Sequence, residues 1–238
     1  KRLADTKCVE FLAETYSHSL ASLISAKEFK AQVKEHAAAI KKHFGVTPKA
    51  FRNTELIYSD EIGAAVADMG YNVMLTEGAK HILGWKSPNY LYCSASNPQL
   101  KLLLKNSELS NDITFRFSDW SWNEFPLDAK KFINWISSTQ ETEDVINLFM
   151  GYETFGEVQN AGTGIFDFLK ALPQFAAEAG IDFQTPSQVF GSRKPVDKIS
   201  VPYPMSWADE ERDLSAWLGN ELQQSAFNKL CSIGERVR

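Results

Sequence analysis

The sequence predicts an α/β fold with a mostly parallel sheet, and three observations support this prediction. Strand-like and helix-like segments alternate along the chain, as they do when helices connect parallel strands. The strand candidates are continuously apolar, which is typical of strands covered on both faces. No GxGxxG pattern follows a strand candidate, and GTG at 162–164 lacks the spacing of a phosphate-binding loop. This disfavours a doubly wound dinucleotide-binding sheet, so we expect a (β/α) barrel.

The first half of the chain supplies strand and helix units in turn. The segment at 25–45 is predicted as a helix because apolar residues recur at helical spacing from Phe29 to Ile40, and Gly45 ends it. A second helix is predicted at 60–70. Strand candidates in this half are CVEFLAETY at 8–16, PKAFRNTE at 48–55, YNVMLTE at 71–77 and NYLYCSA at 89–95.

The second half continues the same alternation. DITFRFS at 112–118 and DVINLFM at 144–150 are strand candidates, and 128–138 is an amphipathic helix. The segment at 164–180 is predicted as a helix interrupted at Pro173. We expect the last long helix to start near Trp207. These elements predict a partial barrel over residues 1–204 and a C-terminal helical segment, residues 205–238, packed on it.

Composition and charge exclude several classes of protein. The chain has 238 residues, 44% hydrophobic and 12% aromatic, which suits a folded globular protein. Its net charge of −5 gives no basic footprint for nucleic acid. Apolar runs such as LKLLL at 100–104 are far shorter than the about 20 residues of a membrane helix. We therefore expect a cytoplasmic protein with no nucleic-acid or membrane partner, and the oligomeric state stays open.

The cysteines indicate neither a disulfide framework nor a metal site. Cys8, Cys93 and Cys231 are odd in number, far apart and without a CxxC pair. We expect reduced core thiols, and we expect no cofactor and no bound metal.

An acidic residue follows the strand candidate at 48–55. Strand alternation in FRNTELIYSDEIG puts Asn53 and Glu55 on one side, at the C-terminal end of the strand. Barrel enzymes carry their catalytic groups at that end. Glu55 is therefore a candidate catalytic carboxylate with Asn53 beside it.

A second acidic and aromatic group follows the apolar run that ends at Met150. In GYETFGEV, Gly151, Glu153 and Phe155 share one side and Tyr152 lies opposite. Aromatic rings stack on the apolar faces of sugars, while carboxylates bind hydroxyls or attack the anomeric carbon. Together the two strand ends predict a carbohydrate site.

Four blocks of the sequence resemble the alpha-amylase-like branch of glycoside hydrolase family 57. They are EFLAETYSHSL at 10–20, FRNTELIYSDEIG at 51–63, YETFGE followed by GIFDFLKALP within 152–173, and SWADEERDLSAWLGN at 206–220. The resemblance spans almost the whole chain. It implies an incomplete seven-stranded barrel followed by a helical segment, and retaining cleavage or transfer of alpha-glucan linkages.

The resemblance also implies roles for particular residues. Glu55 occupies the nucleophile position, and the acid/base aspartate of the family falls where this sequence has Gly151. A retaining mechanism needs two carboxyl groups about 5–5.5 Å apart, and a glycine supplies none. We expect an empty volume at Gly151, and the candidates for a substitute acid are Glu153 and Glu157.

Two further departures from the family pattern stand in the sequence. Val158 replaces the usual histidine, and no histidine is followed by Gln as the family's first-strand segment requires; the four are His18, His36, His43 and His81. We expect on this ground that the natural polypeptide begins before residue 1.

Other residues of the matching blocks are candidates for substrate binding. Glu14 and His18 follow the first strand candidate, and His18 is equally well explained as a plain loop histidine. Trp207 and Trp217 are ten residues apart and therefore on different helical faces, so we expect Trp207 in the cleft and Trp217 in the core. Asp213 is either a site residue or a solvated helix charge. Tyr152 and Phe155 complete the set with Asn53.

Three interpretations of function stay open. The first, which we favour, is a protein that binds an alpha-glucan or maltooligosaccharide but has impaired or lost catalysis because of Gly151. The second is an active retaining hydrolase or 4-alpha-glucanotransferase with Glu55 as nucleophile and another carboxylate as acid. The third is a decayed cleft that binds nothing. A metal-dependent deacetylase is disfavoured, because the sequence offers no cluster of His and carboxylate ligands.

Overall fold

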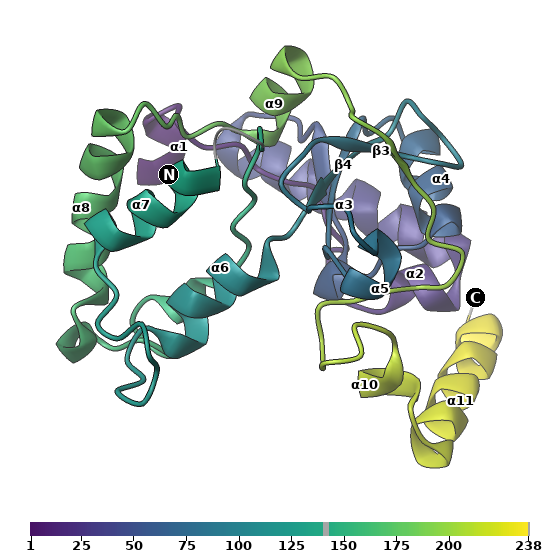
Figure 1. The fold of residues 1–238 in the computed structure, drawn as a ribbon. Helices are drawn as coiled ribbons and strands as arrows, with labels where there is room; N and C mark the ends of the chain where they lie inside the picture. Colours follow the sequence, from purple (N-terminus) through teal and green to yellow (C-terminus); the bar gives the residue numbers. More distant parts are fainter. Residues whose placement is uncertain (140–142, 238) are drawn as a thin grey trace. The chain divides into compact units, whose positions relative to one another are not determined.

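The computed structural model describes residues 1–139 and 143–237, and the chain forms two compact units. The first unit contains residues 1–86, 91–104 and the segment from Thr185 onward. The second unit contains residues 87–90 and 105–184. In Figure 1 the second unit is the teal and green part that carries α6, α7 and α8. The domain boundary predicted after residue 204 stays a prediction.

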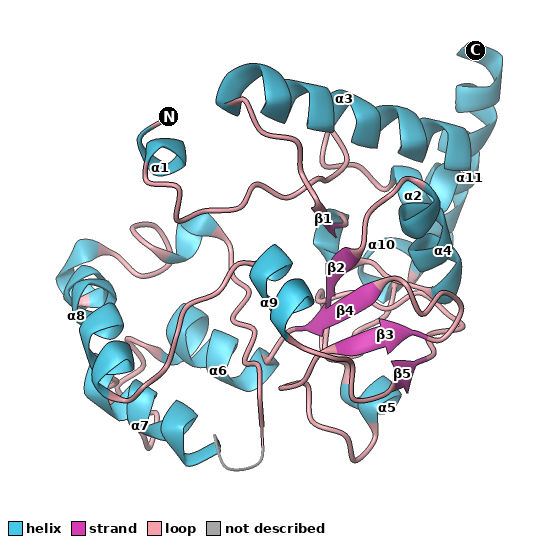
Figure 2. Ribbon diagram, turned by 90° about the horizontal axis from the view of Figure 1, so that it is seen from above, coloured by secondary structure: helices cyan, strands magenta, loops and turns pink. Residues whose placement is uncertain are grey.

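A five-stranded mixed sheet lies at the centre of the first unit, in the order β1-β2-β4-β3-β5. The strands are β1 Ala50–Arg52, β2 Val73–Thr76, β3 Tyr92–Ser94, β4 Lys101–Leu104 and β5 Lys198–Ile199. Neighbouring strands are parallel except β3 and β4, which are antiparallel. Figure 2 shows the strands side by side, with helices around them. The α/β class is confirmed, and the seven-stranded barrel stays a prediction.

The strands have the burial that their sequences predicted. All four residues of β2 are buried, which explains why its apolar run does not alternate. The strands predicted at 48–55, 71–77 and 89–95 are confirmed as β1, β2 and β3. The candidate at 8–16 contributes only a parallel bridge from Ala13 to Phe51, with the Ala13 N–H donating to the Ala50 carbonyl at 2.9 Å.

The first unit also contains several helices. Among its described residues they are α1 Arg2–Asp5, α2 Ala21–Ile24, α3 Ala26–Phe44, α4 Asp60–Asp68, α5 Lys80–Leu83, α9 Pro186–Ser192, α10 Ser215–Leu218 and α11 Glu221–Val237. In α3 the Ser25 side chain caps the start, and Gly45, at φ 75°, ends the helix in the left-handed conformation. The helices predicted at 25–45 and 60–70 are therefore confirmed.

The C-terminal helix starts later than predicted. Asp209 and Arg212 have φ near 55°, which no helix accepts, so the chain from Trp207 to Leu214 is irregular. Helix resumes at Ser215 and again at Glu221. Trp217 is only half-buried, so its predicted place in the core is wrong.

The second unit is helical, and none of its described residues belongs to a β-strand. Its elements are α6 Ser107–Asn111, a π-helix at Asp112–Arg116, α7 Ala129–Thr139, α8 Ile165–Glu178 and 3₁₀ turns at Tyr152–Thr154 and Ala161–Thr163. Their apolar faces form one core; its buried members are Ile113, Phe117, Leu127, Ala129, Phe132, Ile133, Ile136, Ile165, Phe168, Leu172 and Ala176.

Two predicted strands of this unit are wrong. At 112–118, Ile113 and Phe117 are buried while Phe115 is 65% exposed, so the apolar residues follow helical spacing rather than alternation. The segment at 144–150 forms no strand. Its alternate residues pack against the core, but its backbone bonds go to loops and to the Ser110 side chain of α6. The Asn147 carbonyl, for example, accepts from the Asn106 N–H at 2.9 Å.

Helix α8 continues through Pro173 instead of breaking there. Proline removes one helical hydrogen bond and costs about 3 kcal/mol. Pro173 lies on the exposed face, while Phe168, Leu172 and Ala176 on the other face are buried in the core. Burial of each large apolar side chain contributes about 1.5–3 kcal/mol, so the packing outweighs the break.

The structure bears on two predictions made from composition, the burial of the cysteines and the absence of a membrane helix. Cys93 is buried and Cys231 half-buried, but Cys8 is exposed, so the three are not all core thiols. Within the described part of the chain, every helix is too short or too polar to cross a membrane.

Candidate active site

Glu55 lies in a strained turn directly after β1. Thr54–Leu56 forms a 3₁₀ turn in which Glu55 (φ 55°, ψ 25°) and Leu56 (φ 53°) take the left-handed conformation. For residues other than glycine this costs of the order of 1–3 kcal/mol each and persists only where the surroundings enforce it. Here the buried Asn53 side chain enforces it, because its Nδ2 donates to the Ile57 carbonyl and the Ser22 hydroxyl, each at 2.9 Å.

Both carboxylate oxygens of Glu55 are held by partners distant in sequence. One oxygen lies 3.0 Å from His18 Nε2, and the other accepts from the Trp207 indole N–H at 2.7 Å. The Glu55 carbonyl accepts from the Ser206 hydroxyl at 2.9 Å and from the Trp207 N–H at 3.2 Å. The side chain keeps 29% of its surface exposed, so it is fixed but accessible.

Glu14 and Arg52 close these contacts into a ring. Glu14 Oε1 lies 2.5 Å from His18 Nδ1, and Glu14 Oε2 accepts from Arg52 Nη1 at 3.0 Å. The Arg52 guanidinium stacks 4.9 Å above the Trp207 ring, which returns the path to Glu55. We call these five residues, Glu14, His18, Arg52, Glu55 and Trp207, the Glu55 ring.

The contacts set the charge of both His18 and Glu55. Burial alone would lower the pKa of His18, but its bonds to two carboxylates and their negative charges raise it overall. Each ring nitrogen faces a carboxylate, an arrangement that suits the doubly protonated imidazolium. Burial alone would raise the pKa of Glu55, but bonds from His18 and Trp207 and nearby positive charge lower it overall. Glu55 is therefore held ionised, as a nucleophile must be.

These shifts predict a pH window for the coupling between His18 and Glu55. The contribution of Glu55 to stability is fully present above its ordinary pKa of 4.5 and is lost as pH falls through its lowered value. That of His18 is fully present below its ordinary 6.5 and is lost as pH rises through its raised value. We expect His18→Gln to destabilise the protein most between about pH 4.5 and 6.5, by a small amount because His18 is half-exposed.

The measurement is urea unfolding of wild type and His18→Gln at a series of pH values. His43→Gln, which removes an exposed histidine of α3, is the matched control. A destabilisation by His18→Gln that did not change with pH would contradict the charge assignment.

Arg52 is part of the Glu55 ring and was missed in the sequence. Alternation in a strand would place it opposite Glu55. The left-handed turn at Glu55 ends the alternation, so the Arg52 and Glu55 side chains reach the same ring. A basic residue just before the candidate nucleophile could have pointed to Arg52. Sequence alone could not show that the Arg52 side chain lies near Glu55, because that depends on the turn geometry.

His36 also supports the ring from outside. The Glu14 backbone N–H donates to His36 Nδ1 at 3.2 Å, so that nitrogen carries no proton. Burial lowers the pKa of His36, against the opposing charge of Glu14, which keeps the imidazole in this accepting form. No pattern in the sequence distinguished His36 from the other residues of α3.

The other substrate-binding candidates of the first unit have structural contacts. Asn53 is fully buried beneath the turn and is not exposed to a ligand. Asp213 is exposed, and its carboxylate accepts from the Ser215 N–H at 2.7 Å at the start of α10, with a pKa lowered chiefly by that residue. The Glu55 ring thus includes three of the predicted residues besides Glu55: Glu14, His18 and Trp207.

Gly151, in the second unit, lies at the end of the extended segment and has an ordinary backbone. Its φ of −75° and ψ of 157° are open to any residue. The space beside it is not empty, in contrast to our prediction. A Cβ on residue 151 would lie 2.0 and 2.2 Å from the two carboxylate oxygens of Glu153. The Glu153 side chain therefore folds back into the place that a side chain at 151 would take.

The neighbouring residues of this segment are placed differently. Tyr152 is 89% exposed, and Phe155 packs against the core of the second unit. Glu157 is exposed. Tyr152 is thus available to a ligand, whereas Phe155 stabilises the fold. Across the described residues, no three or more His, Cys, Asp or Glu side chains gather to hold a metal ion.

Glu55 thus presents an oriented and accessible carboxylate just after a parallel strand of an α/β unit, with a tryptophan bonded to it. Comparison with known proteins identifies the family. The sequence profile of glycosyl hydrolase family 57 matches residues 1–202. The chain belongs to glycosyl hydrolase family 57.

Particular relatives agree with this assignment. A protein of Methanocaldococcus jannaschii named "Putative alpha-amylase" is 45% identical over 242 residues, covering 100% of this chain and 51% of that protein. The crystal structure of a family 57 branching enzyme from Thermococcus kodakaraensis superposes with a TM-score of 0.76 at 16% identity, over 95% of this chain and 54% of that one. A 4-alpha-glucanotransferase from Thermococcus litoralis superposes with a TM-score of 0.67 at 16% identity, over 83% of this chain and 30% of that one. The chain thus spans about half the length of the relative that it matches in sequence.

Proposed function

We propose that this protein binds alpha-glucans through the Glu55 site and cleaves natural glucan linkages poorly, because Gly151 offers no proton donor. The observation that carries the proposal is the Glu55 ring, which holds an ionised carboxylate at a strand end with both oxygens oriented. An attack on the anomeric carbon needs a carboxylate of this kind. The second half of a retaining mechanism, an acid at position 151, is missing.

The relatives support alpha-glucans as the ligand class. Their names include an alpha-amylase, a branching enzyme and a 4-alpha-glucanotransferase. In the site, the accessible carboxylate, the imidazolium of His18 and the indole of Trp207 supply the hydroxyl-binding and ring-stacking groups that a glucan needs. Neither nucleic acid nor membrane belongs to this proposal.

A second function is favoured by one observation at Gly151. The Glu153 carboxylate lies where the side chain of residue 151 would begin. A carboxylic acid supplied from two residues away could protonate the leaving oxygen in place of the lost aspartate. In this alternative the protein is an active retaining hydrolase or 4-alpha-glucanotransferase with Glu55 as nucleophile and Glu153 as acid.

Glucan binding predicts a thermal shift. A ligand that binds only the folded state stabilises it by about 2.7 kcal/mol at a hundred times its Kd. We expect maltoheptaose at millimolar concentration to raise the Tm of the complete natural polypeptide by a few degrees. Cellohexaose, whose β-linkages give another ring orientation, is the control and is expected to have no effect.

Variants show whether the Tm shift arises from binding at the Glu55 ring. Trp207→Ala is expected to reduce it, whereas Trp85→Ala, which removes an exposed tryptophan outside the Glu55 ring, is expected to retain it. An unchanged Tm of the wild type with maltoheptaose would sink the glucan-binding proposal and favour a decayed cleft.

A further inference from the structure

The second unit carries an open cleft that shares no residue with the Glu55 ring. Its volume is about 350 Å³, within the range of small-molecule sites, about 300–1,000 Å³. The residues that line it are Glu108, Asp112, Arg116, Trp122, Glu124 and Trp135. We call it the Trp122 cleft. None of the roles derived above for Glu55 or Gly151 uses these side chains.

The floor of the cleft comes from an unusual helical segment. Helix α6 passes directly into the π-helix at Asp112–Arg116, and single π turns occur often at functional sites. The Asp112 side chain is buried, and its Oδ1 accepts from Arg116 Nη1 at 2.5 Å. The ion pair fixes the guanidinium and one carboxylate oxygen at the cleft.

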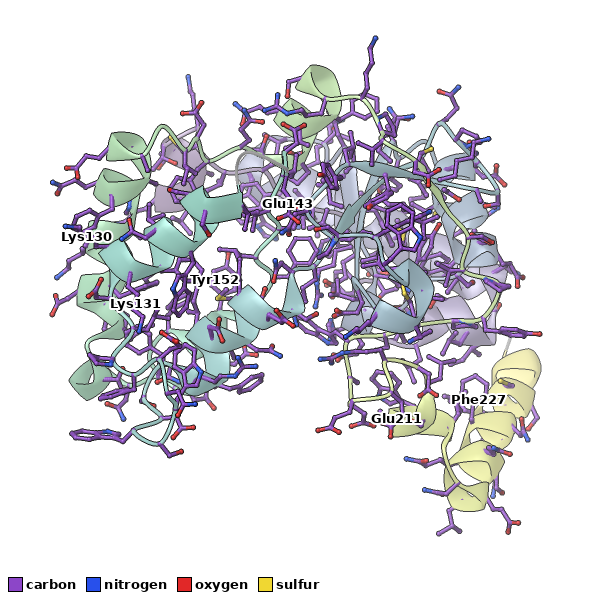
Figure 3. The ribbon with its side chains drawn as sticks, in the orientation of Figure 1. Lys130, Lys131, Glu143, Tyr152, Glu211 and Phe227 are labelled. Carbon is purple, nitrogen blue, oxygen red and sulfur yellow. The ribbon has the colours of Figure 1, made fainter. Side chains whose placement is uncertain are left out.

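Two indole rings line the cleft, and both also pack against the core of the second unit. The Trp122 and Trp135 rings lie 6.0 Å apart, edge to face, at 77°. The Arg116 guanidinium lies 5.9 Å from the Trp122 ring, and the Lys131 ammonium lies 5.4 Å from the Trp135 ring. Figure 3 labels Lys131 on α7. The positive charges on both rings hold the walls in place.

The rim is also fixed. Lys131 Nζ lies 2.8 Å from Glu124 Oε2 and donates to the Glu124 carbonyl at 2.6 Å, which ties the loop after the π-helix to α7. In the same loop Trp120, 85% exposed, stacks on Phe125 with ring centroids 5.2 Å apart. A flat aromatic surface therefore lies on the loop that carries Trp122.

We propose that the Trp122 cleft is a second alpha-glucan-binding site. Perpendicular indole walls fit the apolar face of a sugar ring, while carboxylates and a guanidinium fixed beside them bind its hydroxyls. The choice of alpha-glucan as ligand rests on the proposed function. The inference that the cleft binds a sugar at all rests on its own residues. One or two glucose rings of a longer chain match its size and openness.

Other ligands suit these residues less well. The three carboxylates outnumber the Arg116 guanidinium and the Lys131 ammonium at the rim, and this excess of negative charge disfavours phosphate and other anions. A metal site is disfavoured because Asp112 Oδ1 already accepts a hydrogen bond from Arg116. In addition, no cluster of metal-ligand residues forms among the described residues. Burial raises the pKa of Asp112, with Arg116 acting against it and Glu108 adding to it.

The test is affinity electrophoresis of the complete natural polypeptide in gels that contain amylopectin, with maltoheptaose titration by calorimetry. Five variants are compared: Trp122→Ala, Glu108→Ala, Trp207→Ala, Trp85→Ala and the double variant Trp122→Ala with Trp207→Ala. Glu108 is exposed on α6, so its truncation tests the cleft without disturbing the core if Trp122→Ala fails to fold. Trp85→Ala removes an exposed tryptophan of the first unit and is the matched control.

We expect Trp122→Ala and Glu108→Ala to weaken binding about tenfold or more while Trp85→Ala binds as wild type. Binding that weakens in Trp207→Ala and in Trp122→Ala separately, and is lost when the two are combined, supports two sites. Unchanged binding in both cleft variants, with loss in Trp207→Ala, overturns the second site and leaves the proposed function standing. Loss in the cleft variants with no effect of Trp207→Ala supports the cleft and counts against the Glu55 site. A wild type that does not bind overturns both.

Discussion

Replacing Glu55 by Gln is expected to abolish formation of a covalent glucosyl-enzyme from α-glucosyl fluoride. Fluoride leaves without protonation, so the wild type needs only its nucleophile for this step. The Glu55 carboxylate attacks the anomeric carbon, an ester bond forms, and fluoride departs with the electron pair of the broken bond. Gln keeps the shape, and its carbonyl oxygen can accept from His18 or from Trp207, although its NH₂ cannot accept from the other; its amide is a poor nucleophile.

On the proposed function, the absence of an acid at position 151 makes this intermediate observable. Release of the sugar needs a base to activate water, and Gly151 provides none. We therefore expect the wild-type ester to accumulate and to appear in the mass spectrum of the intact protein, and azide, which attacks without a base, to release it. Glu61→Gln, at an exposed glutamate of α4, should behave as wild type. A label found on another carboxylate in Glu55→Gln would show that Glu55 is not the nucleophile.

The fold was predictable where local pattern and tertiary packing agree. Helix α3 has a serine cap, an apolar stripe and a terminal glycine, and all three appear in the structure. The segment at 112–118 shows the opposite case. Its apolar residues satisfy alternation and helical spacing equally well, and the buried positions of Ile113 and Phe117 decided for the helix. Short apolar runs carry no information on that choice by themselves.

Four of the five residues of the Glu55 ring were named from the sequence, but the contacts that join them were not. Glu14, His18, Glu55 and Trp207 all stand in blocks that resemble one family. Their ring of contacts depends on a left-handed turn at a glutamate, a conformation that no propensity favours. Arg52 was missed for that reason, and Asn53 was given a ligand-binding role although its buried amide enforces the turn. The strain identifies the turn as a place where surrounding structure, not local sequence, sets the geometry.

Gly151→Asp is expected to raise cleavage of maltoheptaose by about 100- to 10,000-fold, the usual contribution of general acid catalysis. The backbone at φ −75° accepts aspartate without strain. The new Cβ meets the Glu153 carboxylate, which is the exposed end of a flexible side chain and can move aside. Two adjacent carboxyl groups also raise the pKa of one of them, which favours the protonated acid that the first step needs.

Two matched variants separate the effect of the carboxyl group from that of its neighbour. Gly151→Ala displaces the Glu153 side chain in the same way but supplies no acid, so we expect it to leave cleavage of maltoheptaose as slow as in the wild type. Glu153→Gln should also change little if Glu153 only fills space. Steady hydrolysis of maltoheptaose by the wild type, lost in both Gly151→Ala and Glu153→Gln, would instead identify Glu153 as the acid. In that case the glycine at 151 is what gives the Glu153 carboxylate its room, since any side chain there would occupy the same volume.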